Sequence, residues 1–179
     1  KVIEELLALG DEATQRASDD PKYQQFIELY PPNRLSSLSL TEYCVGKGDG
    51  ESFCWWLERG LQSILGRYMP GTSRGHILYF QKDGSIYKHA QLKDLSDEEA
   101  LAYTLSIQAT IAKADINANL EWIDDDQLLF QRAGVESRVT VGHGRKLRLL
   151  SCYNPEDTVP ISSSSHLGHF LHVLGCPES

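Results

Sequence analysis

Two stretches of this chain combine basic and aromatic side chains, the residue types best suited to contact nucleic acid. Residues 61–93 hold 5 Lys or Arg against 1 acidic residue, and residues 127–152 hold the same numbers. Lys and Arg bind phosphate oxygens, whereas aromatic rings stack on exposed or flipped bases. The pattern predicts a DNA-binding surface, with a sheet that merely carries solvated charge as the alternative interpretation. The predicted phosphate contacts are Arg67, Arg74, Lys82, Lys88, Arg145 and Lys146, and the predicted stacking or pocket residues are Tyr68, His76 and Trp55.

The total charge of the chain opposes this prediction, and only the distribution of charge supports it. The formal net charge is −8, and residues 94–126 hold 9 acidic residues against 1 basic residue. A local field, and not the sum over the chain, attracts a polyanion. The DNA-binding prediction therefore requires that the two basic stretches meet in one exposed surface. Burial of these side chains, or ion pairs with Asp and Glu, would remove that surface.

Motifs for nucleotide or metal chemistry are incomplete. Residues 45–52 contain a Gly-Lys pair but lack the G-x-x-x-x-G-K-[ST] spacing of a phosphate loop, so they predict an ordinary loop. Asp126 with Glu136-x-Arg138 approximates a metal-dependent nuclease pattern, although Arg stands where Lys is usual. Spacing alone does not show that carboxylates converge on a metal ion. We predict a chain without catalytic residues, metal or cofactor, and keep a metal-dependent nuclease as an alternative.

Histidine and cysteine residues give no recognisable site. Three histidines recur every third residue on a predicted helix near the end of the chain, but no usual paired-ligand spacing for zinc is present, so a half-exposed helix flank is expected. No Ser-His-Asp or Cys-His arrangement can be identified. The four cysteines lie far apart without a C-x-x-C pair, which predicts reduced, mostly buried thiols. These residues are His166, His169 and His172, with Cys44, Cys54, Cys152 and Cys176.

Local signals place the elements that would position these residues. Asp20-Pro21 marks the start of a helix that ends before Pro31, and Ser52 is a candidate N-cap for a helix over 53–67. Asp-Gly between two runs rich in Ile, Tyr and Phe predicts a β-hairpin over 75–89. Ser96 with Glu99 forms a candidate capping box for a helix that ends near Asp115. Further predictions are an amphipathic helix over 2–17, a helical turn or two over 38–46, strands within 121–132 and 137–153, and a final helix capped by Ser165.

These elements predict an α+β fold, with an antiparallel sheet that has a basic face and packs against several helices. We divide the chain into an N-terminal helical appendage, residues 1–34, and an α+β DNA-recognition domain, residues 35–179. No apolar run approaches the ~20 residues that span a bilayer. The first residues, KVIEELLALGDEA, lack the pattern of a signal peptide. We therefore expect a cytoplasmic protein without membrane contact.

Two motifs resemble the N-terminal regions of McrB-like AAA+ restriction proteins. Residues 51–67, ESFCWWLERGLQSILGR, carry the F-C-x-W-L-E helix of that family. Residues 146–175 resemble its closing pattern, in which a strand leads into a Pro-Ile-x-Ser turn and then a helix of the form H-L-x-x-F-L-x-x-L-G. The resemblance spans most of residues 35–175. Relatives have a Gly-rich stretch after the W-L-E helix, whereas this chain has GRYMPGTSRGH (66–76), which predicts a different target.

The resemblance implies a non-catalytic specificity domain of a modification-dependent, type IV restriction system in anti-phage defence. Such a domain binds double-stranded DNA, often at a modified base such as a modified cytosine. A downstream AAA+ module and a nuclease subunit would then act on the DNA. Besides the nuclease, one alternative stays open: a protein-interaction or sensor module of an anti-phage AAA+ motor, with the acidic stretch 94–126 as its working surface.

Overall fold

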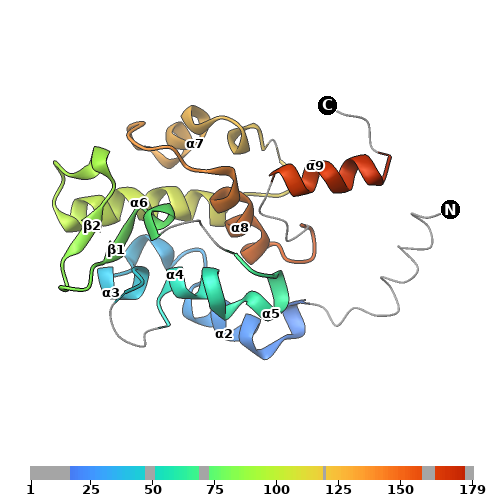
Figure 1. The fold of residues 1–179 in the computed structure, drawn as a ribbon, viewed down its shortest axis with the longest axis horizontal. Coiled ribbons are helices and arrows are strands. Elements are labelled where there is room, and N and C mark those ends of the chain that lie inside the picture. Colours follow the sequence, from blue (N-terminus) through green and yellow to red (C-terminus); the bar gives the residue numbers. More distant parts are fainter. Residues whose placement is uncertain (1–16, 47–50, 69–72, 119, 159–163, 176–179) are drawn as a thin grey trace.

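The computed structural model describes residues 17–46, 51–68, 73–118, 120–158 and 164–175, without the side chains of Ser73, Arg74, Ser164 and Leu167. These residues form mainly helices and one two-stranded antiparallel sheet (Figure 1). The elements are η1 (Ala17–Asp19), α2 (Pro21–Leu29), η2 (Leu35–Ser37), α3 (Leu40–Tyr43), α4 (Phe53–Trp55), η3 (Trp56–Gly60), α5 (Gln62–Leu65), η4 (Ser73–His76), β1 (Leu78–Phe80), β2 (Ile86–Lys88), η5 (Ala90–Leu92), α6 (Asp97–Ala112), η6 (Glu121–Ile123), α7 (Asp126–Ala133), α8 (His143–Tyr153) and α9 (Ser164–Val173). No helix in these ranges is long and apolar enough to cross a membrane.

The α2 helix begins where the sequence predicts and belongs to the main core. The Asp20 side chain accepts a hydrogen bond from the Lys22 backbone N–H at 2.8 Å, and Pro21 occupies the first turn. Phe26 is fully buried, with its ring centroid 6.2 Å from that of Phe53 and 5.6 Å from that of Tyr153. Residues 17–34, part of the predicted appendage, therefore share one hydrophobic core with the rest of the chain. The predicted helix over 2–17 lies almost wholly outside the described residues.

The segment from α4 to α5 carries the F-C-x-W-L-E motif and lines the core. Ser52 caps α4 as predicted, because its hydroxyl accepts a hydrogen bond from the Trp55 backbone N–H at 3.3 Å. The next turn, η3, is π-helical and ends at Gly60. A Cβ at Gly60 would collide with the ring of Trp56, so only glycine fits there. The apolar residues of the motif are buried, namely Phe53, Cys54, Trp56 and Leu57.

The predicted hairpin is confirmed. Strands β1 and β2 pair antiparallel with Tyr79 opposite Tyr87. In the turn, the Asp83 carboxylate accepts hydrogen bonds from the backbone N–H and hydroxyl of Ser85, at 3.0 and 2.6 Å. Gly84 has a φ of 83°, a conformation that glycine adopts without steric cost. In Figure 1 the hairpin and α9 lie at opposite ends of the long axis of the molecule.

The central element of the fold is α6. Its predicted capping box is present, since the Ser96 hydroxyl accepts from the Glu99 backbone N–H and the Glu99 carboxylate accepts from the Ser96 backbone N–H. Ten of its 16 residues are buried. Helices α7 and α8 pack against it, and so does η2 from the N-terminal part of the chain. This helix therefore packs against elements from both the N-terminal and the C-terminal parts of the described chain (Figure 1).

The prediction of strands within 121–132 and 137–153 is wrong. Residues 126–133 form α7, whose N-cap Asp125 accepts from two backbone N–H groups and whose C-cap Gly134 is left-handed. Residues 143–153 form α8. Val139 and Val141 are buried, but they lie in the irregular segment before α8 and pair with no strand among the described residues. The sheet is therefore limited to β1 and β2 in the described chain, and the structure is mixed but mostly helical.

We expect Gly60→Ala to destabilise the fold by about 1–3 kcal/mol, because the new methyl group must displace the buried Trp56 ring from its packing. Urea unfolding measures this directly. Gly168→Ala on α9 is the matched control, since a Cβ there meets no atom within 4 Å. Equal stability of the two variants would show that the close contact at Gly60 is not a constraint.

Candidate functional site

Six polar side chains from five segments of the chain meet inside the core. Each is buried or half-buried, and each is bonded to at least one other member of the group. A buried polar cluster of this size is unusual, because every unsatisfied group in it would cost free energy. We call the group the buried polar network. Its members are Tyr43 on α3, Cys54 on α4, Glu58 on η3, His76 on η4, Gln108 on α6 and Arg145 on α8.

Arg145 is the centre of the buried polar network. Its guanidinium is 4% exposed and donates in four directions. Nε donates to Gln108 Oε1 at 3.1 Å, and one terminal nitrogen donates to His76 Nδ1 at 2.5 Å. The other terminal nitrogen lies 3.2 Å from the Tyr43 hydroxyl and 3.8 Å from Cys54 Sγ. One side chain of α8 thereby fixes the positions of α3, α4, η4 and α6.

The contacts of His76 determine which ring nitrogen carries the proton. Because Arg145 can only donate, Nδ1 of His76 must accept, and the hydrogen of a neutral ring then resides on Nε2. That N–H donates to the Glu58 carboxylate. The hydrogen bond from His76 holds the pKa of Glu58 below its usual range, although burial opposes this shift. The backbone carbonyl of His76 also accepts from the Tyr43 hydroxyl at 2.9 Å.

The residue after His76 is held in a strained backbone conformation. Ile77 has a φ of 69° and is the one non-glycine residue with positive φ in the described ranges. This region is unfavourable for a β-branched side chain, and such strain clusters at functional sites. The bonds of His76 hold the chain on one side, and the Ile77 carbonyl accepts from the His89 backbone N–H at 3.0 Å on the other. The strain therefore accompanies the insertion of His76 into the network.

Cys54, His76 and Glu58 are the residue types of a nucleophilic triad, which the sequence does not reveal. Two facts speak against a general-base role for His76. Its Nδ1 lone pair is already occupied by Arg145, so it is not free to take the thiol proton. Cys54 is also fully buried. The arrangement instead places a thiol beside a guanidinium, which stabilises negative charge on sulfur. The sequence signal that could have indicated this site is the four-residue spacing of Cys54 and Glu58 on one helical segment.

Four of the nine predicted DNA-binding residues are buried. Arg145 and His76 belong to the buried polar network. Lys146 is 2% exposed and directs its ammonium to the carbonyls of Trp122 and Ile123, at 3.0 and 2.8 Å, and to the Asp126 carboxylate at 2.6 Å. Tyr68 is 6% exposed beneath the guanidinium of Arg148. The prediction that Arg145 and Lys146 stand on an exposed cationic sheet surface is therefore wrong.

The other five predicted residues differ in exposure and in their partners. Lys88 is half-buried and bonded to the Leu95 carbonyl at 2.6 Å and to Asp97 at 2.9 Å. Trp55 is half-buried with its ring edge on Trp56, at a centroid distance of 5.4 Å. Arg67 and Lys82 are exposed, and the side chain of Arg74 lies outside the described residues. Two other basic residues of the stretch 127–152 also have partners inside the protein: Arg148 is buried, and Arg138 pairs with Asp94 and Glu136.

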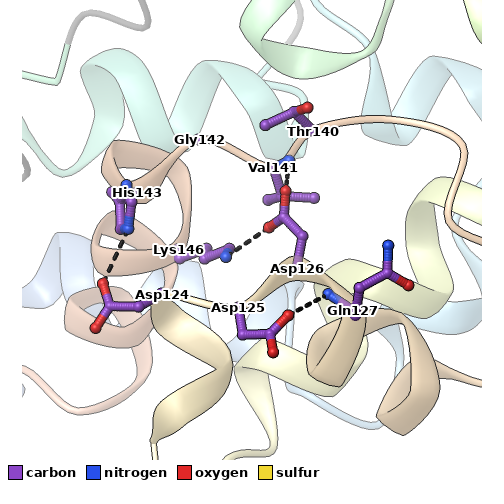
Figure 2. A pocket seen from close by; sticks show the side chains of 9 residues that line it. All are labelled: Asp124, Asp125, Asp126, Gln127, Thr140, Val141, Gly142, His143 and Lys146. Atoms are coloured by element: carbon purple, nitrogen blue, oxygen red, sulfur yellow. Dashed lines mark hydrogen bonds and ion pairs between the residues drawn. The ribbon is translucent and has the colours of Figure 1, made fainter.

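A cleft of about 340 Å³ opens between the start of α7 and the start of α8 (Figure 2). Three successive aspartates line it, but each faces a different partner. Asp124 bonds to His143 at 3.0 Å, and Asp125 caps α7. Asp126 accepts from the Val141 backbone N–H at 3.0 Å and pairs with Lys146. Glu136, the other carboxylate of the nuclease pattern, does not line the cleft. The described residues contain no group of three or more His, Cys, Asp or Glu placed to hold a metal ion.

Helix α9 presents an apolar surface. Within the described residues, the large hydrophobic side chains that are exposed all lie on it or at its end, with exposed fractions of 41–65%. Residues 164–174 contain no Asp, Glu, Lys or Arg. The three predicted histidines are exposed on this helix, as expected for a helix flank, and Cys176 lies outside the described residues. We call this surface the α9 patch; its members are Phe170, Leu171, Val173 and Leu174.

Comparisons of the chain with protein-family models, with curated proteins and with solved structures found no match. The resemblance to McrB-like proteins is therefore untested by them. Function must be argued from the residues that the structure places together.

The strain at Ile77 predicts that glycine at this position gives a more stable protein than alanine does, the reverse of the usual order. Glycine normally destabilises a folded segment more than alanine does. At a φ of 69° we expect Ile77→Gly to be more stable than Ile77→Ala by about 1 kcal/mol, because alanine retains the steric clash of the left-handed region. Urea unfolding of both variants measures the difference, and both lose the same buried side chain apart from one methyl group. The usual order, with alanine the more stable, would rule out strain at this position.

The lowered pKa of Glu58 predicts a pH dependence of stability. Because the folded-state pKa lies below the unfolded one, the contribution is complete above the unfolded pKa and is lost as the pH falls through the folded pKa. We expect Glu58→Gln to lower the free energy of unfolding by about 1 kcal/mol at neutral pH, since a charge-assisted bond becomes a neutral one. The loss should shrink toward acid pH. Urea unfolding between neutral and acid pH tests this, with the exposed Glu28→Gln as control; a loss independent of pH would contradict it.

Proposed function

We propose that this chain is a non-catalytic protein-interaction module and that its partner at the α9 patch is a second copy of the chain. The observation that carries the proposal is the concentration of exposed apolar side chains on one uncharged helix. Exposed apolar patches mark interaction sites in folded proteins. Of the residues predicted to form the DNA-binding surface, by contrast, Arg145, Lys146 and His76 are buried.

The properties of α9 favour an identical partner over a charged one. Phe170, Leu171 and Leu174 share one side of the helix, since residues spaced by three and four lie on the same face. The helix has no formally charged side chain to pair with a complementary partner, and it meets no repulsion from a copy of itself. Gly168 adds no side chain and lets a second backbone approach. Two-fold contacts between identical patches are also the commonest arrangement in soluble oligomers.

The experiment is a concentration series by sedimentation equilibrium. We expect the wild-type chain to form a dimer and the double variant Phe170→Glu with Leu174→Glu to stay monomeric, because the added carboxylates would be buried without partners. The matched control is Gln62→Glu with Gln91→Glu, which adds the same charge at two exposed positions outside α9. A wild-type chain that remains monomeric at about 100 µM, a concentration at which a Kd of 1 µM would give mostly dimer, would overturn the proposal.

DNA recognition within an McrB-like restriction system is the second candidate, and the exposure of Arg67 and Lys82 favours it. A surface that neutralises six phosphates predicts a log–log salt slope of about −5, whereas two or three contacts predict no more than about −3. A gel-shift series with unmodified and modified duplexes at two salt concentrations measures this slope. A slope near −5, combined with a monomeric chain, would favour DNA recognition over the interaction module. In either case the resemblance to McrB-like proteins would imply an AAA+ module and a nuclease subunit as further partners.

A further inference from the structure

Three buried thiols in this chain have different electrostatic surroundings. Cys44, Cys54 and Cys152 are all free and buried. Burial raises the pKa of Cys44, and it raises the pKa of Cys152 to about 11. Burial acts in the same direction on Cys54, but the pKa of this thiol is lowered by the groups that face it, His76 and Arg145. With the His76 ring neutral, the charge that acts on the sulfur is that of the Arg145 guanidinium. Cys54 is thus distinguished from two otherwise similar thiols by the groups that face it.

The charges around Cys54 are not balanced by carboxylates. Helix α8 buries two guanidinium groups, Arg145 and Arg148, which are 4% and 1% exposed. Arg148 donates to the backbone carbonyls of Leu57 and Leu65, at 3.0 and 2.7 Å. Neither arginine forms an ion pair with a carboxylate in the described part of the chain. Glu58 acts on Arg145 only through the ring of His76.

One of these two arginines, and a neighbour of the other, carry unpaired hydrogen-bond donors. The second terminal nitrogen of Arg148 has no acceptor, and neither has the amide nitrogen of Gln108, a fully buried side chain whose oxygen binds Arg145. Buried cations and donors without acceptors cost free energy unless negative charge is supplied nearby. Ionisation of Cys54, 3.8 Å from the Arg145 guanidinium, supplies it.

We propose that Cys54 is a thiolate in the folded chain and is a site of reversible oxidation by hydrogen peroxide and similarly small hydroperoxides. The thiolate sulfur attacks one peroxide oxygen, an S–O bond forms and the O–O bond breaks. Sulfur loses two electrons to give a sulfenic acid, whose hydroxyl keeps the proton of the attacked oxygen, and the departing hydroxide passes to solvent, where the buffer protonates it. Burial restricts the reaction to water-sized oxidants that reach the site when the structure opens locally. Bulky alkylating reagents react slowly with the folded chain.

Oxidation changes the force that holds the buried polar network together. The neutral sulfenic acid no longer offsets the charge of Arg145, and its added oxygen must fit into a packed interior. The contacts that connect α8 to η4 and α4 are weakened, so the oxidised chain melts at a lower temperature. Reduction by a thiol restores the original state. This inference does not depend on the proposed dimer, because the α9 patch carries none of these groups.

The test is peroxide treatment of the folded full chain, removal of the peroxide, and unfolding in the presence of a sulfenic-acid trap such as dimedone, followed by peptide mass spectrometry. We expect the adduct at Cys54 and not at Cys44 or Cys152, with a fall in Tm that dithiothreitol reverses. Cys54→Ser should be insensitive to peroxide, and Cys152→Ser should respond as wild type does. Equal labelling of the three buried thiols, or labelling that spares Cys54, would overturn the proposal.

The role of Arg145 is tested without removing it. Gln108→Glu is nearly isosteric and places a carboxylate on the Arg145 guanidinium, at the position where Oε1 already accepts. We expect this variant to lose thiolate absorbance at neutral pH and to oxidise more slowly at Cys54 than wild type does, because the new carboxylate offsets the guanidinium charge that favours the thiolate. Thiolate absorbance, taken as wild type minus Cys54→Ser across a pH titration, gives an independent readout. Equal absorbance of wild type and Cys54→Ser at neutral pH would contradict the thiolate. This comparison stands even if Gln108→Glu fails to fold. The titration also involves the other groups that face Cys54, namely Tyr30, Tyr43, Cys44, Tyr68, His76 and Arg145.

Discussion

The burial of the Arg145 guanidinium is the constraint on which the arrangement of this fold depends. A guanidinium cannot lose its charge in a protein, so an interior that contains one must supply acceptors in a fixed plane around it. Its partners come from residues 37 to 102 positions away in the chain. These bonds join α8 to α3, α4, η4 and α6 inside the core. The strained backbone at Ile77 follows from the same requirement, because His76 must enter the interior to complete the set of acceptors.

The local elements were predictable because their signals lie within a few residues of one another. Asp20-Pro21, Ser52, the Asp83-Gly84 turn and the Ser96–Glu99 capping box all form the contacts that their residue types suggest. Each satisfies backbone groups at the end of an element without help from distant segments. The buried, reduced state of Cys44, Cys54 and Cys152 was likewise predictable from their spacing.

The error over α7 and α8 has an identifiable physical cause. In K-L-R-L-L, apolar and basic residues alternate, which favours a strand with one apolar and one charged face. In α8 the same residues turn by about 100° per step, so Arg145, Arg148 and Cys152 share an inward face. A long basic side chain is buried in a core only if hydrogen-bond acceptors are present there. Those acceptors lie in segments far from α8 in the sequence, so the local pattern of residues does not reveal them. For α7, the cap residues Asp125 and Gly134 are typical of a helix, whereas the apolar run between them favours a strand.

The buried polar network escaped prediction for the same reason, and it also changes what the charge distribution means. Basic residues clustered along a sequence suggest a cationic surface only if they stay in solvent. In the later cluster, Arg145, Lys146 and Arg148 are buried. Arg138 is neutralised by two carboxylates at the surface. Four of the five basic residues in the later cluster therefore contribute little to a cationic surface, whereas Arg67 and Lys82 of the earlier cluster stay exposed. Helix α9 carries no formal charge, so repulsion between acidic side chains does not oppose the approach of a second copy of the chain. Apolar association is therefore the physically simpler use of this surface.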